Sequence, residues 1–254
     1  MEKISVGIIG SGNIAWSLGE ILKKHFSITY IHSRNLIEAK RLSVKLKTAY
    51  IKKSEIALQN TDLLFVCLSD DVLSTYLTGI NFKKTIILHT SGSANMNLLA
   101  NYSKNIGVFY PVQTINKIEK TDWRNVPICI EASNSKTKKI IDEIAKQISD
   151  RVYYLNSSKR TKLHLAAVFA NNFSNACFSF ADEILEKEKI PFEIIKPLIA
   201  ATASNVMLRK PSEVQTGPAK RGDLKTIKKH IALLENDKAL QSIYKLITKR
   251  ISKA

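Results

Sequence analysis

A run of small residues near the N-terminus has the spacing of a phosphate-binding turn. It follows an apolar segment and precedes a segment with helical periodicity, and it reads Gly10-Ser11-Gly12-Asn13-Ile14-Ala15. The first glycine permits a tight turn and the second lets a pyrophosphate approach the backbone, while alanine takes the third position, where helix and strand pack closely. The free N–H groups of a helix N-terminus attract phosphate. The run therefore predicts dinucleotide binding by residues 10–14; the alternative is a glycine turn that binds nothing.

The end of the second expected strand indicates which dinucleotide would bind. NAD sites place an Asp or Glu here, about 20 residues after the glycines, to accept a hydrogen bond from the ribose 2′-hydroxyl. This chain instead has Ser33 and Arg34 here, and the first carboxylate after this strand, Glu38, falls within the next helix. A hydroxyl and a guanidinium suit a 2′-phosphate. We therefore expect NADP, with NAD as the less favoured cofactor; the alternative is that Arg34 is a solvated residue at a helix start.

Polar and small residues also end the next two apolar strands. Leu68 and Ser69 lie at the end of one strand, and Ser91 and Gly92 follow the other. Ligands of open α/β sheets lie outside the carboxyl ends of the strands. We expect these four residues to touch the nicotinamide half of the cofactor, although Ser69 with Asp70 could equally be a helix cap.

Strands alternate with helices through residue 155. The expected strands are 3–9, 27–32, 61–68, 84–89, 106–110, 126–131 and 151–155, and the expected helices are 14–24, 35–47, 71–77 and 137–148. This alternation is typical of a doubly wound, Rossmann-type parallel sheet. After the good helix caps at 156–158 no strand pattern follows, so an all-helical domain is expected over 156–254. Its helices are predicted at 159–189, from 191 to about 208, at 224–235 and at 238–251, with a loop at 209–223.

A polar stripe marks the otherwise apolar segment 163–185, which we expect to be a central buried helix. At about 100° per residue, His164, Asn171 and Asn175 share one face, and Asn172 and Ser179 lie beside it. One interpretation is a buried hydrogen-bond network or a dimer seam. The other places His164 and Asn172 at the mouth of the cofactor cleft, where histidine could donate a proton as hydride arrives.

The segment 215–223 is a second candidate for substrate contact. It combines two glycines and a proline with clustered charges, among them Arg221 and Asp223. Arg221 could hold a substrate carboxylate in a bidentate pair. For Asp223 we favour the simpler role of capping the next helix.

The composition excludes several classes of function. The net charge of +17 is spread over both halves of the chain, unlike the concentrated basic stripes of nucleic-acid binders, so nucleic acid is not an expected partner. No run of about 18 apolar residues exists, and a membrane span is not expected. The three cysteines are far apart in apolar surroundings, which argues against a disulfide scaffold or a cysteine-based metal site and fits the reducing cytoplasm.

Several motifs together resemble a family of bacterial proteins known as putative NADP oxidoreductases, which pair a Rossmann-like domain with a C-terminal helical domain of unknown function. The resemblance covers essentially the whole chain and rests on the glycine turn and on four further runs: residues 89–93, 110–114, 164–173 and 216–223. The family is similar in turn to pyrroline-5-carboxylate reductases, β-hydroxyacid dehydrogenases and deazaflavin-dependent NADP reductases. The resemblance implies the fold, the cofactor class and homodimers built on the helical domain, but no substrate.

Two positions depart from these relatives. Val168 stands where β-hydroxyacid dehydrogenases carry a catalytic lysine, one turn before an asparagine that matches Asn172. Tyr110 stands before Pro111, where many relatives have histidine. The resemblance therefore argues against hydroxyacid chemistry by that lysine.

Two functions fit these observations. The first is an NADP(H)-dependent oxidoreductase that reduces a small C=O or C=N substrate, with His164 as proton donor, Asn172 as a positioning group and Arg221 as an anion clamp. The second is a non-catalytic sensor or scaffold that binds NADP(H) without turning it over. No metal is expected in either case.

Overall fold

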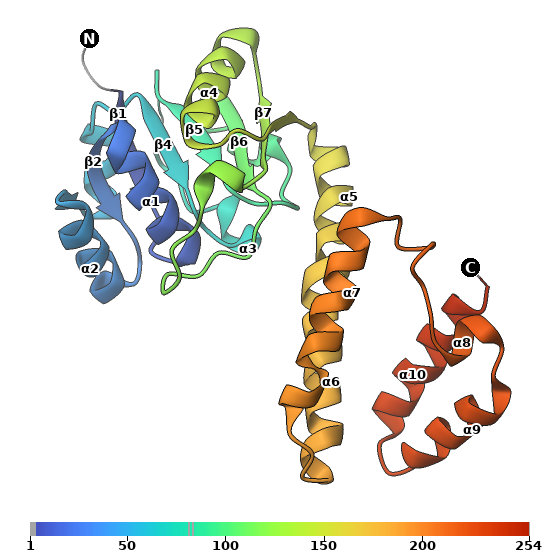
Figure 1. The fold of residues 1–254 in the computed structure, drawn as a ribbon. Helices are drawn as coiled ribbons and strands as arrows, with labels where there is room; N and C mark the ends of the chain where they lie inside the picture. Colours follow the sequence, from blue (N-terminus) through green and yellow to red (C-terminus); the bar gives the residue numbers. More distant parts are fainter. Residues whose placement is uncertain (1–3, 81, 83, 254) are drawn as a thin grey trace. The chain divides into compact units, whose positions relative to one another are not determined.

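The computed structural model describes residues 4–80, 82 and 84–253, which fold into two compact units, Met1–Ala170 and Asn171–Ala254. The first unit contains a sheet with interleaved helices and the second is entirely helical, as Figure 1 shows. The predicted fold class, a Rossmann-type sheet followed by an all-α region, is thus confirmed. Strands give way to helices between Tyr154 and Ser157, whereas the compact units divide later, after Ala170.

The sheet of the first unit has the strand order β3-β2-β1-β4-β5-β6-β7-β8 within the described residues. The strands are β1 (Ser5–Ile9), β2 (Ser27–His32), β3 (Ala49–Tyr50), β4 (Leu63–Val66), β5 (Ile86–His89), β6 (Ile106–Pro111), β7 (Ile128–Ala132) and β8 (Val152–Tyr154). The first six follow the order of dinucleotide-binding sheets, and the order reverses between β1 and β4, where such sheets bind their ligands.

One pair of strands corrects the expectation of a parallel sheet. β7 pairs antiparallel with β6, while the other strand pairs are parallel. The reason lies in the connection, residues 112–127, which returns to the edge where β6 ended: the Val112 N–H donates to the Pro127 carbonyl at 2.8 Å. A parallel pairing would have required a crossover to the opposite edge.

Helices α1 (Asn13–His25), α2 (Leu36–Leu46) and α4 (Ser135–Ile148) pack on one face of the sheet around a core that includes Leu18, Phe65 and Phe109. The opposite face carries the short α3 (Asp70–Leu73) and two 3-10 segments, Lys53–Leu58 and Met96–Leu99, over a second core. Both faces of the central strands are therefore buried, which explains their continuous apolar runs.

The predicted elements of the first half differ from the structure mainly at their ends. The helix expected over 71–77 ends at Leu73, and the strand β3 was not predicted because two residues are too few for a periodic signal. The first strand was expected from residue 3, which lies outside the described residues.

The expected helix over 159–189 is interrupted in its hydrogen bonding. Helix α5 (Ser157–Ala167) is followed by a π-helical turn, Val168–Phe173, and then by α6 (Ser174–Lys187). A π turn holds more residues than an α turn. The projection at 100° per residue that aligned His164 with Asn171 and Asn175 is therefore wrong beyond Ala167.

Further corrections apply to the C-terminal helices. Pro197 lies in the first turn of α7 (Lys196–Leu208) and begins that helix without interrupting it. The loop expected over 209–223 contains a short helix, α8 (Pro218–Arg221), before α9 (Leu224–Leu233) and α10 (Lys238–Ile251). In the part of the chain that the structure describes, every helix is too short or too polar to cross a lipid bilayer.

The expectation that residues 163–185 form a buried central helix is also wrong for the single chain. Leu165, Phe169 and Phe173 are 57%, 61% and 50% exposed, and no residue of α6 is buried. Apolar side chains continue along α7, where Leu198, Met207 and Leu208 are exposed. The segment from α5 to α7 thus leaves many large apolar side chains exposed in the single chain.

Candidate active site at the carboxyl edge of the sheet

The glycine turn has the backbone that its sequence predicts. Gly10 has φ +117°, and its N–H donates to the carbonyl of His32 at 2.8 Å. A Cβ at this position would lie 2.3 Å from the carbonyl oxygen of Cys67 on the neighbouring strand end. The first glycine is therefore required by the fold itself, because both its φ angle and the available space exclude a side chain.

Gly12 is required by neither of these constraints. Its φ is −76°, an ordinary value, and a Cβ built there meets no atom within 4 Å. It precedes Asn13, the first residue of α1, and no side chain caps this helix. An open approach to uncapped N–H groups is the arrangement in which helix N-termini bind phosphate, so the residues present fit a pyrophosphate.

The end of β2 supplies hydroxyl groups beside this turn. The Ser33 side chain is buried, and its Oγ lies 2.9 Å from the Oγ of Ser11. The N–H of Asn35 donates to Ser33 Oγ at 3.3 Å and holds it in place. Both serines are predicted cofactor-binding residues, and the structure brings their hydroxyls together.

Two cations approach the same aromatic ring next to these hydroxyls. The guanidinium carbon of Arg34 lies 5.7 Å and the Nζ of Lys53 lies 5.2 Å from the centre of the Tyr76 ring. The Tyr76 hydroxyl is 3.0 Å from Nε2 of His32, whose pKa is lowered, mainly by burial. Sequence reasoning missed Lys53 and Tyr76, since neither belongs to a local motif.

The loops after β4 and β5 are joined to each other. Leu68 is half-buried, and Ser69 is the residue before α3 but makes no side-chain capping bond. The next residue, Asp70, accepts a hydrogen bond from the hydroxyl of Ser93. Ser91 stabilises the second loop, because its Oγ accepts from the N–H of Ala94 at 2.9 Å.

Gly92 packs directly beneath two polar side chains, Tyr110 and His164. A Cβ at Gly92 would lie 2.6 Å from His164 Nδ1 and 2.7 Å from Tyr110 Cζ. The Tyr110 hydroxyl is 3.1 Å from His164 Nδ1, and the two rings meet edge to face at 5.9 Å. Because β5 and β6 are parallel to β1, this cluster lies on the same edge of the sheet as the glycine turn, about 10–14 Å away at ~4.8 Å per strand.

A buried ion pair holds α5 in the position that brings His164 to this cluster. Arg160 is fully buried and pairs with Glu131 of β7, and it also donates to the carbonyl of Ala94. The N–H and hydroxyl of Ser157, in the first turn of α5, donate to the Glu131 carboxylate at 2.9 and 2.8 Å. Since His164 follows Arg160 by four residues, both lie on one face of the helix.

Burial sets the protonation of two groups near the cluster. It raises the pKa of Tyr110, so the phenol keeps its proton at neutral pH. It lowers the pKa of His89, with a further contribution from Arg160, to about 3. His89 is therefore neutral; its Nδ1 accepts from the N–H of Ser91 at 3.2 Å, and its buried Nε2 has no partner among the described residues.

The other predicted catalytic residues belong to the second unit. Asn172 is exposed within the π turn, and Arg221 is exposed at the last position of α8. Asp223 caps α9 by accepting from the N–H of Thr226 at 3.0 Å. Asn175 and Ser179 line a separate cavity of about 400 Å³ in this unit, together with Asp182 and Lys196. The roles assigned to Asn172 and Arg221 stay predictions.

Comparison with known proteins places the chain in a family. Residues 126–251 match the family described as a domain of unknown function (DUF2520). The structure superposes with a TM-score of 0.89 on a putative NADP oxidoreductase from Bacteroides fragilis, at 35% identity over 99% of both chains. The chain therefore belongs to the same family as this Bacteroides fragilis protein, with a DUF2520 domain over residues 126–251. No curated protein matches it.

More distant structures share the fold of this DUF2520 protein. They include a reductive aminase from Aspergillus terreus in complex with NADPH (14% identity, TM-score 0.75, 100% of this chain and 94% of the other). A 1-pyrroline-5-carboxylate reductase from Streptococcus pyogenes also matches (14% identity, TM-score 0.65, 99% of both chains). At these identities the likeness concerns the fold alone.

Alanine substitution at the two glycines of the turn should change the stability by very different amounts. Gly10→Ala forces a Cβ against the Cys67 carbonyl at a positive φ, and we expect it to lower the free energy of unfolding by about 1–3 kcal/mol. Gly12→Ala, the matched control, should change it by less than about 0.5 kcal/mol. Urea denaturation of both variants measures the difference, and equal losses would contradict this account of Gly10.

A pH dependence follows from His89. The unfolded chain binds a proton on this histidine below pH 6.5 and the folded chain does not, so stability falls as the pH falls. Between pH 7 and pH 5 the wild type should lose about 2 kcal/mol more than His89→Asn, which keeps an acceptor for Ser91 without titrating. Parallel denaturation series at both pH values test this. Equal losses would show that folding does not hold His89 neutral.

Proposed function

We propose that this DUF2520 protein is an NADP(H)-dependent oxidoreductase that reduces a small C=O or C=N substrate. The observation that carries the proposal is the glycine turn with its open Gly12, flanked by the paired hydroxyls of Ser11 and Ser33. Arg34 and Lys53 add positive charge at the end of β2, where the ribose of a dinucleotide lies. A 2′-phosphate would gain charged hydrogen bonds there.

The proposed chemistry needs a hydride and a proton at the carboxyl edge of the sheet. NADPH supplies the hydride when bound. The Tyr110–His164 pair would deliver the proton to the oxygen or nitrogen of the reduced bond, since the protonated phenol and the imidazole are already in hydrogen-bond contact. In the same proposal Asn172 positions the substrate and Arg221 binds an anionic group on it, while Arg160 and Glu131 hold His164 in place.

The cofactor assignment predicts a preference that one substitution removes. Wild-type protein should bind NADPH more tightly than NADH, and Arg34→Ala should weaken NADPH binding roughly 10- to 100-fold with little effect on NADH. Arg41→Ala, an exposed arginine of α2, is the matched control. Titration by nucleotide fluorescence measures all three proteins. Binding of neither nucleotide by the wild type would contradict the proposal.

The same preparations separate an enzyme from a sensor. In a screen of small aldehydes, ketones and cyclic imines, Tyr110→Phe and His164→Ala should lower kcat by about 10²- to 10⁴-fold and leave the NADPH Kd unchanged. Tight NADPH binding without turnover of any of these substrates would favour the alternative function, a non-catalytic NADP(H) sensor or scaffold.

We further propose that the protein is a homodimer joined through the helical unit. The exposed large apolar side chains of α6 and α7 support this, because monomers rarely leave large apolar patches in water. Sedimentation at low micromolar concentration should give a dimer. Leu198→Glu with Met207→Glu should produce monomers, while Leu58→Glu, at an equally exposed leucine of the first unit, should not. A monomeric wild type would contradict the proposal.

A further inference from the structure

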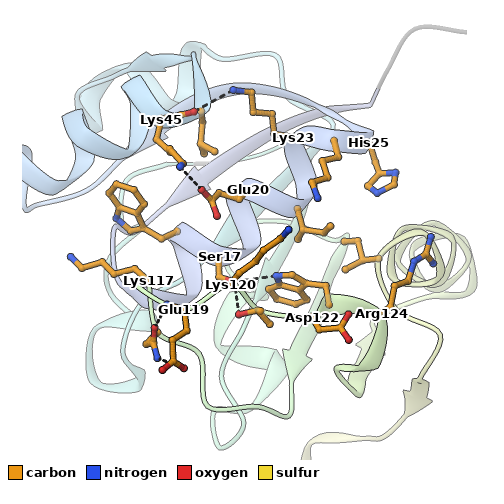
Figure 2. A pocket seen from close by; sticks show the side chains of 18 of the residues that line it. Ser17, Glu20, Lys23, His25, Lys45, Lys117, Glu119, Lys120, Asp122 and Arg124 are labelled. Carbon is orange, nitrogen blue, oxygen red and sulfur yellow. Dashed lines mark hydrogen bonds and ion pairs between the residues drawn. The ribbon is translucent and has the colours of Figure 1, made fainter.

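The first unit contains a large cavity that the proposed reaction does not use. Its volume is about 1180 Å³, and it lies along α1 beneath residues 116–124 of the connection between β6 and β7, as Figure 2 shows. Its lining does not include the glycine turn or the ends of β4 and β5. Cavities of roughly 300–1,000 Å³ hold drug-sized ligands, so the space admits a molecule as large as a nucleotide.

Hydrogen bonds fix the wall of this cavity. Trp123 is buried and its Nε1 donates to Ser17 Oγ of α1 at 3.1 Å, and Ser17 donates to Thr121 Oγ1 at 3.0 Å. The side-chain oxygen of Asn116 accepts the N–H groups of Ile118 and Glu119, at 2.9 and 2.6 Å, which holds the turn of the loop. The cavity is therefore formed before any ligand arrives.

The acidic groups of the lining are already engaged. Glu20 pairs with Lys45 at 3.0 Å. The Glu119 carboxylate accepts from the side-chain amide of Asn116 at 3.1 Å. Asp122 accepts from the side-chain amide of Asn125 at 2.7 Å. Of these three carboxylates, Glu20 is the one that forms an ion pair in the part of the chain that the structure describes.

Basic side chains predominate around the same space. The lining has three carboxylates and six lysines and arginines, namely Lys23, Lys24, Lys45, Lys117, Lys120 and Arg124. Lys117 and Arg124 pair with Glu38 and Asp150, outside the lining. Lys45 pairs with Glu20, and among the described residues no ion pair holds the remaining three, Lys23, Lys24 and Lys120. The Nζ of Lys23 donates to the carbonyl of Lys45 at 3.3 Å. Lys23 and Lys24 belong to α1 and Lys120 belongs to the loop; Figure 2 labels Lys23 and Lys120 among the lining residues.

One buried donor in the lining also has no acceptor. The Nε1 of Trp16 is buried, and it has no hydrogen-bond partner among the described residues. Lys117 Nζ lies 5.8 Å from the centre of the same indole ring. The indole N–H itself is not accessible from the cavity, so Trp16 contributes the rest of its ring to the lining.

We propose that this cavity is a second ligand site, which takes a small molecule carrying two or more phosphates. Lys23 and Lys24 of α1 and Lys120 of the loop, the three lysines without ion pairs, would contact the phosphates. The site is separate from the cofactor site, and its existence does not depend on the proposed reductase activity.

The two tryptophans of the chain, Trp16 and Trp123, both line the cavity, so intrinsic fluorescence reports its occupancy. Inorganic tripolyphosphate, titrated at constant ionic strength, should give a saturable fluorescence change. The double variant Lys24→Ala with Lys120→Ala should weaken this binding at least tenfold. Lys104→Ala with Lys136→Ala removes the same charge from exposed positions outside the cavity and should leave it unchanged.

Three results would overturn the proposal. The first is a wild-type protein that shows no saturable change. The second is equal weakening in both double variants, which would indicate general attraction to a basic surface. The third is loss of the tripolyphosphate signal at saturating NADPH, which would place the anion in the cofactor site. A signal that persists in the presence of NADPH supports the second site if the Lys24→Ala, Lys120→Ala variant weakens it and the Lys104→Ala, Lys136→Ala variant does not.

Discussion

The position of α5 depends on one buried ion pair, Arg160 with Glu131. Removing two charges from water is costly, and the cost is offset only where further hydrogen bonds satisfy both groups. Here Ser157 donates twice to the carboxylate and the guanidinium donates to the Ala94 carbonyl, so helix, strand and loop meet at one pair; the buried Nε of Arg160 has no partner among the described residues. Any other position of α5 on the sheet would separate Arg160 from Glu131 and leave each charge buried without its partner, which is unfavourable. The contact between Tyr110 and His164 follows from this position of α5.

The antiparallel β7 determines which end of α5 meets which edge of the sheet. Because β7 runs against β6, and β8 is parallel to β7, the chain leaves β8 at the amino edge of the parallel strands. Helix α5 therefore begins beside Glu131 and, about two turns later, brings His164 to Tyr110 near the carboxyl end of β6. In a wholly parallel sheet the helix would have started at the carboxyl edge and carried His164 away from it.

Local signals in the sequence were sufficient for the glycine turn, the apolar strands and the change to helices, since each of these depends on residues close together in the chain. The pairing of Tyr110 with His164 was not predictable, because the two residues are 54 positions apart and meet only through the reversed strand β7. The π turn at Val168–Phe173 left no signature in the apolar pattern. The burial expected for residues 163–185 was inferred from apolarity, which cannot distinguish the core of one chain from a surface covered by another.

At the end of β2, where NAD sites carry a carboxylate, this chain has two paired hydroxyl groups near a buried histidine. His32 is buried and its lowered pKa keeps it uncharged, so it supports Tyr76 without adding charge beneath the ring. The positive charge is on Arg34 and Lys53, next to the Tyr76 ring. Both side chains are in contact with water, which weakens the repulsion between the two cations. Asn35 and Ser11 hold Ser33 in place, so a phosphate would meet hydroxyl groups that are already oriented. The proposal of NADP over NAD rests on the two cations, because an unmodified ribose would gain nothing from them.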